Sequence, residues 1–556
     1  MSLTLIALIA LVFFAAGYLG YSRVIARKLG LNDANSTPAC TMADGVDFVP
    51  AKAPFLLGQH FSAIAAASPI VGPILAGLAF GWLPTLLWIV FGAIFIGAVH
   101  DFSSLFGSIR HKAGSVAKIV QEYLGKRAYI LFLSFIWFSL VYVITAFADL
   151  TSSSFSEPIS GGAVATSSVL YLVLAVVMGV SMTRFKMRLG VATAIFMPLL
   201  AAIIWAGQII PFQLPEVGRI PPVILWDVLV LGYCFLASIL PVWVLLQPRG
   251  YLGGVFLYMA LVAGLVGLAL GGVSVRYPAF IGFTGMSGWP LMPMLFVTVA
   301  CGACSGFHGL VASGTTSKQV AQESDCRPVG YGGMLLEALV ALIALATVMM
   351  LSPSDPNTRL SPDRIYAQGL ATFVQQFGIP HRSAMAFVLL AFATFIFDTL
   401  DVATRLGRYI LQELFGWQGT WGRVAATLAT LALPAWFITV TLTDSAGNVV
   451  PAWRMFWTVF GASNQLLAGL TLLGLTLWLR KSGRAWGFAA VPCFFMMVVT
   501  LWALTILLNG WLMRIRSSGA WLDPVGVASL LLVGLALCLL WEGWKTLRIN
   551  LDATPL

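Results

Sequence analysis

The feature that most constrains the fold is a long series of apolar runs, each roughly 18–25 residues, the length of a helix that crosses a bilayer. Fifteen such runs lie at about 3–22, 60–80, 83–104, 129–148, 164–180, 190–210, 223–246, 251–271, 290–313, 333–351, 384–404, 424–442, 456–479, 486–509 and 522–543. Only 9% of the 556 residues are charged, whereas soluble domains carry about 25%. We therefore expect an all-α polytopic membrane protein with about fifteen transmembrane helices.

The basic residues predict how the helices are oriented. Most of the 31 Lys and Arg residues fall in alternate connections, such as 110–127, 184–188 and 480–484, when the chain is threaded from an outside N-terminus. Positive charge gathers on the cytoplasmic side of membrane proteins, so we expect the C-terminus to be cytoplasmic. The net charge of +10 is explained by this topology, and we expect the lipid bilayer rather than nucleic acid as partner. The first apolar run has no basic residues before it, so we expect a retained helix rather than a cleaved signal peptide.

The second run is interrupted by Ser68-Pro69 and Gly72-Pro73. Proline removes a backbone donor, which leaves carbonyls unpaired, and broken helices at mid-membrane hold ligands in secondary transporters. The alternative is a proline kink that only shapes packing. We take His60, Ser62, Ser68 and Gly72 as candidate substrate-binding residues, and Ala65 and Ser68 as candidate cation ligands.

The third run ends in His100-Asp101, near its expected cytoplasmic end. A histidine beside a carboxylate can carry a proton, and at the inner rim the pair can act in gating. Plain interface chemistry with headgroups and water explains the pair equally well.

The ninth run continues into a segment rich in glycine and hydroxyl groups, CGACSGFHGLVASGTTSK, at 301–318. Hydroxyl and carbonyl oxygens suit a hard cation such as sodium, and a lysine could supply a fixed positive charge in its place. The alternative is a small-residue face for close helix packing. Cys301 and Cys304 are interpreted as packing residues, with no metal site and no disulfide framework expected. We take Ser305 and His308 as candidate substrate-binding residues, and Ser313, Thr315, Thr316 and Lys318 as candidates for cation coupling.

Asp398, Asp401 and Glu337 are carboxylates inside later apolar runs. Buried carboxylates can bind and release protons. Asp398 and Asp401, three residues apart, share one helix face, and Arg405 follows at the expected inner interface, where it could neutralise Asp401 or act in gating. Asp398 is the better candidate proton carrier, and Glu337 is another.

Two amides are further candidates for binding substrate, Gln247 at the inner end of the seventh run and Asn464 inside the thirteenth. Bonding between neighbouring helices is at least as good an explanation for them. The sequence lacks GxxxxGK[ST], HExxH and GxSxG. We therefore expect no enzyme and no cofactor beyond a coupling ion, H⁺ or Na⁺, and favour a secondary transporter or a channel.

Several of these segments carry a resemblance to a known family. The runs DFVPAKAPFLLGQHFSAIAAASPIVGPILA, GAVHDF, LLQPRGYL, CGACSGFHGLVASGTTSK, FDTLDVATRLGRYILQE and FGASNQLLAGL resemble, in the same order, the carbon-starvation protein A family of bacterial peptide and pyruvate transporters. The family is grouped with the amino acid–polyamine–organocation superfamily. The resemblance implies a leucine-transporter-like core of two inverted five-helix repeats.

The resemblance also implies a division of the chain. We expect an N-terminal helix and loop at 1–56, a first repeat at 57–210, a second at 223–410 and accessory helices at 420–556. The break at Pro69–Pro73 would then pair with a break at Pro241 in the seventh run, beside the hydroxyls of the ninth.

The implied function is import of short peptides or pyruvate-like carboxylates across a bacterial inner membrane, coupled to protons or sodium, in the carbon-starvation response. The alternative is a channel-like or nutrient-sensing membrane protein without coupled transport.

Overall fold

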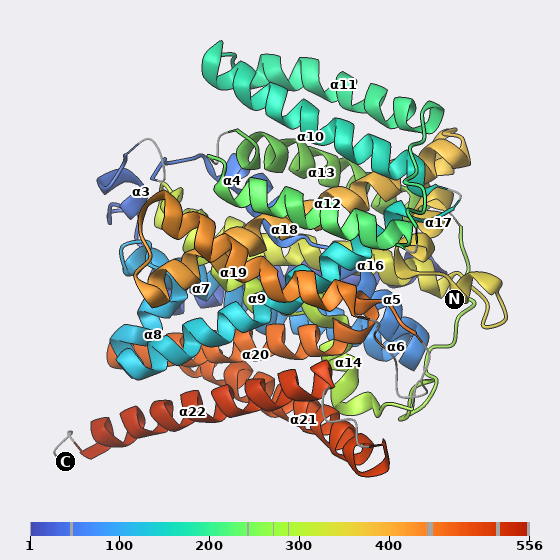
Figure 1. The fold of residues 1–556 in the computed structure, drawn as a ribbon. Helices are drawn as coiled ribbons and strands as arrows, with labels where there is room; N and C mark the ends of the chain where they lie inside the picture. The colour runs from blue at the N-terminus through green and yellow to red at the C-terminus, as the bar shows by residue number, and fades with distance from the viewer. Residues whose placement is uncertain are drawn as a thin grey trace.

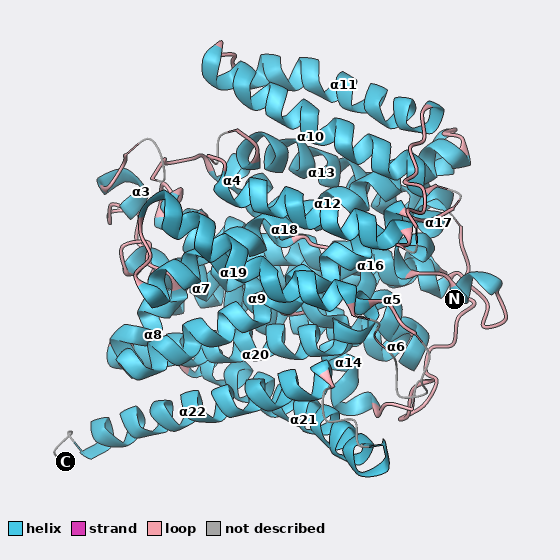
Figure 2. Cartoon of the chain, viewed as in Figure 1, coloured by secondary structure: helices cyan, strands magenta, loops and turns pink. Residues whose placement is uncertain are grey.

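The computed structural model describes residues 2–44, 48–158, 160–218, 220–241, 244–270, 272–286, 288–440, 442, 449–518 and 523–552. This part of the chain is almost entirely helical (Figure 2). It contains fourteen helices long and apolar enough to cross a membrane, and one bent helix pair makes a fifteenth candidate span. The predicted class, an all-α polytopic membrane protein with about fifteen spans, is therefore confirmed.

The helices, in chain order, are α1 (Leu3–Ala16), α2 (Ser22–Leu29), α3 (Pro38–Thr41), α4 (Ala53–Ile64), α5 (Ser68–Phe80), α6 (Trp82–Leu87), α7 (Ala98–Arg110), α8 (Val116–Leu124), α9 (Lys126–Phe155), α10 (Gly161–Arg184), α11 (Leu189–Ile209), α12 (Pro222–Ile239), α13 (Leu246–Leu270), α14 (Leu291–Val299), α15 (Gly306–Gly314), α16 (Gly333–Met349), α17 (Pro362–Val374), α18 (His381–Phe415), α19 (Gly419–Thr439), α20 (Ala452–Lys481), α21 (Gly487–Ser518) and α22 (Pro524–Asp552). Shorter π-helical segments, η2 (Trp88–Gly97) and η6 (Arg327–Gly332), continue α6 into α7 and lead into α16.

The long helices form a central bundle with a helical hairpin at each of two opposite edges (Figure 1). The hairpin of α10 and α11 lies at one edge and that of α21 and α22 at the other, and the two helices of each hairpin pack together. Near the centre, α9 packs against α18, and α5 packs against α16. Of the candidate site residues, Ser68 and Gly72 lie on α5, Glu337 on α16, and Asp398, Asp401 and Arg405 on α18.

The first interruption lies at residues 65–67. Helix α4 ends at Ile64, Ala65 leaves the helical conformation (φ −73°, ψ 82°), and α5 begins at Ser68 at an angle of 52° to α4. Pro69 lies in the first turn of α5, where the missing N–H has no helical partner to lose. The interruption is therefore just before Ser68-Pro69 as predicted, whereas Gly72-Pro73 lies inside α5 and does not break it.

A second interruption lies in the ninth span. Helix α14 ends at Val299, a short turn of 3₁₀ helix follows at Ala300–Gly302, and α15 begins at Gly306. The expectation of a break at Pro241 within the seventh span is wrong, because α12 ends at Ile239 and Pro241 lies in the connection to α13. The run of small residues before α15, with weak helix propensity, accounts for the second interruption.

The two interrupted helices approach each other closely. A Cβ placed on Gly72 would lie 2.4 Å from the carbonyl oxygen of Val299 and 2.7 Å from that of Thr298. Near the same crossing, the backbone N–H of Cys301 donates to Ser68 Oγ at 3.3 Å. Only glycine allows the two backbones to approach this closely, so Gly72 makes the contact between α5 and the end of α14 possible.

Different helices pack beside the two interruptions. Helix α13 packs on α4, and α20 packs on α14 and α15; α12 packs on α9, and α19 packs on α18. In the connection between α16 and α18, α17 is continued by a 3₁₀ turn at Gln375–Phe377. The division into repeats at 57–210 and 223–410 stays a prediction.

Candidate functional site

A cavity of about 420 Å³ lies where α4, α15 and α18 meet. Residues of α8, α9 and the start of α13 complete its wall, together with the connections before α4, after α7 and after α15. It brings together eight of the residues predicted from the sequence, namely His60, Ser62, Ser313, Thr315, Thr316, Lys318, Asp398 and Arg405. Helix α4, which precedes the first interruption, and α15, which follows the second, therefore line one cavity, as expected for a transport site built at helix breaks.

Charges of both signs line this cavity. Lys318 and Arg405 supply the cations, and Asp398 and Glu413 the carboxylates. The Lys318 Nζ lies 5.6 Å from the centre of the Phe48 ring, a cation–π contact. The remaining wall is mostly aliphatic, so the cavity combines an apolar body with a few charged groups that could orient a polar ligand.

Arg405 binds backbone rather than a carboxylate. Its Nη2 donates to the carbonyl oxygens of Ala237 at 2.6 Å and Leu240 at 2.8 Å. The last carbonyls of a helix have no partner within it, and Arg405 satisfies those at the end of α12. The expectation that Arg405 forms the ion pair of Asp401 is therefore wrong; its role in gating stays a prediction.

Arg249, on α13, is the partner of both aspartates on α18. Its guanidinium forms ion pairs with Asp398, at 2.9 Å, and with Asp401. Ser62 Oγ donates to Asp398 at 3.1 Å, and the Tyr233 hydroxyl donates to Asp401 at 2.8 Å. Arg249 is fully buried, and burying one cation between two anions offsets much of the desolvation cost of each group.

The sequence alone did not assign Arg249 this role, although it lies in the LLQPRGYL segment noted above. A usable signal was present, because two carboxylates on one helix face inside the membrane require a cation nearby.

A second buried group of ionisable residues joins α7, α15 and α16. His308 Nδ1 lies 2.7 Å from Asp101 Oδ2, and His308 Nε2 lies 2.8 Å from Glu337 Oε2. Asp101 Oδ1 lies 2.7 Å from His100 Nδ1. All four side chains are fully buried. The expectation that His100 and Asp101 lie at the inner rim, in contact with headgroups and water, is therefore wrong, because both face the protein interior.

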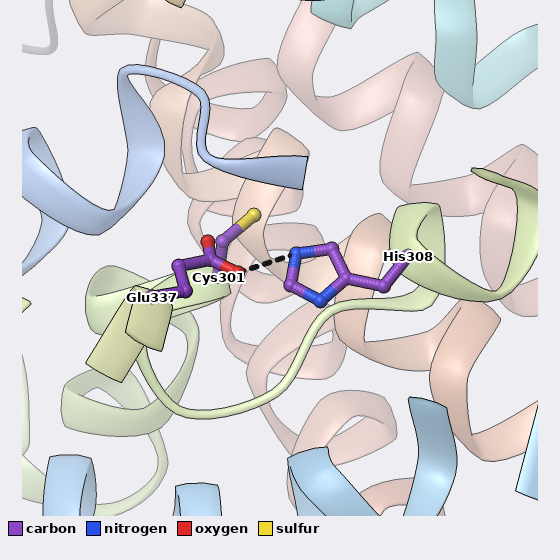
Figure 3. A group of neighbouring side chains, drawn as sticks. All are labelled: Cys301, His308 and Glu337. Carbon is purple, nitrogen blue, oxygen red and sulfur yellow. Dashed lines mark ion pairs between the residues drawn. The ribbon is translucent and has the colours of Figure 1, made fainter. Parts of the chain in front are cut away.

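Cys301, His308 and Glu337 also form a set that could offer metal ligands, since one atom of each lies within 4.8 Å of the others (Figure 3). The ring nitrogens of His308, however, each already lie within 2.8 Å of a carboxylate oxygen. The Asn464 amide donates to Cys301 Sγ at 3.0 Å. We therefore interpret the group as a chain of ion pairs and hydrogen bonds rather than a metal centre.

The hydroxyls predicted to bind a cation are engaged separately. Ser313 Oγ donates to the Gly309 carbonyl, Thr315 Oγ1 donates to the Val311 carbonyl, and Thr316 Oγ1 lies 2.9 Å from His60 Nδ1. Ser68 accepts from the Cys301 N–H. Among the described residues, no two of these four hydroxyls bond the same partner. Ala65 lies at the interruption, and its role as a carbonyl ligand stays a prediction.

Asn464, on α20, binds the interrupted segment rather than the cavity. Its Oδ1 accepts from the Phe307 backbone N–H at 2.9 Å, and its Nδ2 donates to Ser305 Oγ at 3.0 Å. Asn464 and Ser305 therefore hold the start of α15 in place. The side chain of Gln247 lies outside the described part of the structure.

The sequence profile of the family described as "Carbon starvation protein CstA" matches residues 2–358 and 355–503. The chain belongs to this family. Relatives within the CstA family include the "Peptide transporter CstA" of Helicobacter pylori (strain J99 / ATCC 700824), which is 33% identical over 88% of this chain and 80% of the relative. The "Pyruvate/proton symporter BtsT" of Escherichia coli (strain K12) is 30% identical over 88% of this chain and 80% of its own.

The similarity to solved structures is weaker. The manganese transporter of Eremococcus coleocola gives a TM-score of 0.48 at 11% identity, over 91% of this chain and 98% of that chain. MhsT in complex with L-phenylalanine gives a TM-score of 0.45 at 14% identity, over 87% of this chain and 98% of that chain.

Membership of the CstA family and the candidate membrane spans together confirm the general expectation of a membrane transport protein. The chain is a multi-pass membrane transporter.

Proposed function

We propose that this member of the CstA family is a secondary transporter that carries small organic carboxylates, either short peptides or pyruvate-like acids, into a bacterial cell together with protons. The names of two relatives, a peptide transporter and a pyruvate/proton symporter, support this substrate class and coupling ion. The proposal also includes the inner membrane as location, with the N-terminus outside and the C-terminus in the cytoplasm.

The observation that carries the proposal is the cavity between the interrupted helices. Its volume of about 420 Å³ falls within the ~300–1,000 Å³ typical of small-molecule sites. Lys318 and Arg405 offer positive charge for a carboxylate, and Asp398 offers negative charge for the amino group of a peptide. Opposite charges on one wall suit a zwitterionic peptide, whereas pyruvate requires the cations alone.

Proton coupling is supported by the buried ionisable groups. Asp101, His308 and Glu337 form one group, and Arg249 with its two aspartates forms another. Ionisable groups within membrane spans are costly and typically lie on ion or proton pathways. A sodium site would instead need several oxygens around one point, and the hydroxyls of Ser313 and Thr315 are each donated within their own helix.

Uptake into proteoliposomes tests the proposal. Purified protein is reconstituted, and entry of radiolabelled pyruvate and of radiolabelled dialanine is followed under an inward proton gradient, an inward sodium gradient, or neither. We expect the proton gradient to drive accumulation of at least one of the two probes above its equilibrium level. Entry that only equilibrates under either gradient, without accumulation, or conductance in single-channel recordings, would instead favour a channel. Protein-free liposomes are the control.

A further inference from the structure

Glu337 is a fully buried acid in the described part of the membrane core, and its carboxylate is only partly paired. It lies on α16 with no exposed surface, one carboxylate oxygen 2.8 Å from His308 Nε2. The other oxygen, Oε1, has no hydrogen-bond partner among the described residues. A buried carboxylate oxygen without a donor is costly when the group is charged. The same oxygen is a free position for a proton.

Counting charges shows what the group around Glu337 requires. His308 lies between two carboxylates, Asp101 on one ring nitrogen and Glu337 on the other. A histidine that donates from both nitrogens is a cation. Two carboxylates and one imidazolium leave a net charge of −1 in the protein interior, where an unbalanced charge is expensive. One added proton on Glu337 makes the group neutral.

The other titratable side chains that face this group are histidines and cysteines rather than fixed cations. His100 lies beside Asp101 on α7, and His60 approaches from α4 with its Nδ1 on Thr316. Cys301 and Cys304 lie in the interrupted segment before α15. All are buried, and none of them is a fixed cation comparable to Arg249 in the neighbouring group.

We propose that Glu337 carries the coupling proton, and that Asp101, oriented by His100, holds His308 against it. This inference rests on the proposed function and adds the residue through which it works. In the transport cycle a proton from the outer solution forms an O–H bond on Glu337, and the same bond breaks when the proton is released to the cytoplasm. His308 stays protonated throughout and is a positioning residue.

The position of His308 links the protonation of Glu337 to the shape of the cavity. His308 lies on α15, and the same short helix contributes Leu310, Val311 and Ser313 to the cavity wall. While Glu337 is charged, its attraction for His308 ties α15 to α16. Protonation removes that attraction, so α15 is freer to move relative to α16 and the cavity wall changes with it.

Glu337→Gln in the full chain, reconstituted in proteoliposomes, tests the proposal. Glutamine keeps the size of the side chain and mimics the protonated state. We expect exchange of labelled for unlabelled pyruvate or dialanine across the membrane to continue, while accumulation driven by the proton gradient falls at least tenfold. Glu122→Gln is the matched control, because the Glu122 side chain is 60% exposed, and it should behave as wild type.

The outcomes are distinguishable. Wild-type protein that ignores the proton gradient would overturn the proposed function itself. Wild-type coupling that persists in Glu337→Gln would overturn the role of Glu337 alone. If Glu337→Gln loses exchange as well, Glu337→Asp decides: gradient-driven uptake restored with a displaced pH profile supports the proposal, and uptake that remains absent overturns it.

Discussion

Arg249 Nη2 lies 2.9 Å from Asp398 Oδ1, an ion pair between α13 and α18 beside the cavity that Asp398 lines. The same guanidinium pairs with Asp401 one helical turn further along α18. Ser62 links Asp398 to α4, so the pair joins the first interrupted helix to two other helices of the core. A fixed cation therefore occupies the point between these helices.

Removing the guanidinium should destabilise the protein strongly. In Arg249→Met, Asp398 and Asp401 remain buried without their counter-charge, and breaking a buried ion pair from one side costs about 3–5 kcal/mol. We expect a clear fall in the melting temperature of the purified protein in detergent. Arg382→Met, at an exposed position on the same helix as the aspartates, is the control. A melting temperature equal to that of the control would contradict the assigned pairing.

The crossing of the interrupted helices should also be sensitive to one added methyl group. In Gly72→Ala the new Cβ would lie 2.4 Å from the Val299 carbonyl oxygen, and overpacking of this kind costs about 1–3 kcal/mol. We expect lower thermal stability and slower uptake of labelled probe. Gly232→Ala is the control, because its Cβ meets nothing within 4 Å and alanine is favoured in a helix. Equal behaviour of the two variants would show that the close approach is absent.

The spans and the first interruption could be predicted because they follow from local composition. A run of apolar residues long enough to cross a bilayer predicts a helix, and Pro69 predicts where that helix breaks. The resemblance predicted the family from short motifs, and the match over residues 2–358 and 355–503 confirms it.

The second interruption and the ion pairs depend on contacts between distant segments. No proline marks the break before α15; small residues permit it, and Asn464, about 160 residues later in the chain, supplies the missing backbone partner. The pairing of Arg249 with Asp401 likewise spans 152 residues. The prediction chose Arg405, the nearer arginine in sequence, whereas the fold brings Arg249 to the aspartates.

Asn464 should determine how firmly the start of α15 is held. Asn464→Ala removes the acceptor of the Phe307 N–H and the donor to Ser305, and a buried group left unpaired costs about 1–3 kcal/mol. We expect amide hydrogen exchange in the 301–314 segment to become roughly 5- to 150-fold faster, the equivalent of that free energy. Ser463→Ala is the control, since Ser463 bonds only its own helix at Phe460. Unchanged exchange in Asn464→Ala would contradict this role.

Lys318 should set the affinity for the carboxylate of the substrate. In Lys318→Gln the cavity keeps its shape but loses a charge, and a hydrogen bond to a charged group contributes about 1.5–3 kcal/mol. We therefore expect KM for labelled pyruvate to rise about tenfold or more, with kcat little changed because the buried groups around Glu337 are untouched. Lys118→Gln, exposed on α8, controls for the loss of a surface charge. A wild-type KM in Lys318→Gln would exclude Lys318 from the binding site and leave Arg405, already bonded to the end of α12, as the remaining cation on the cavity wall.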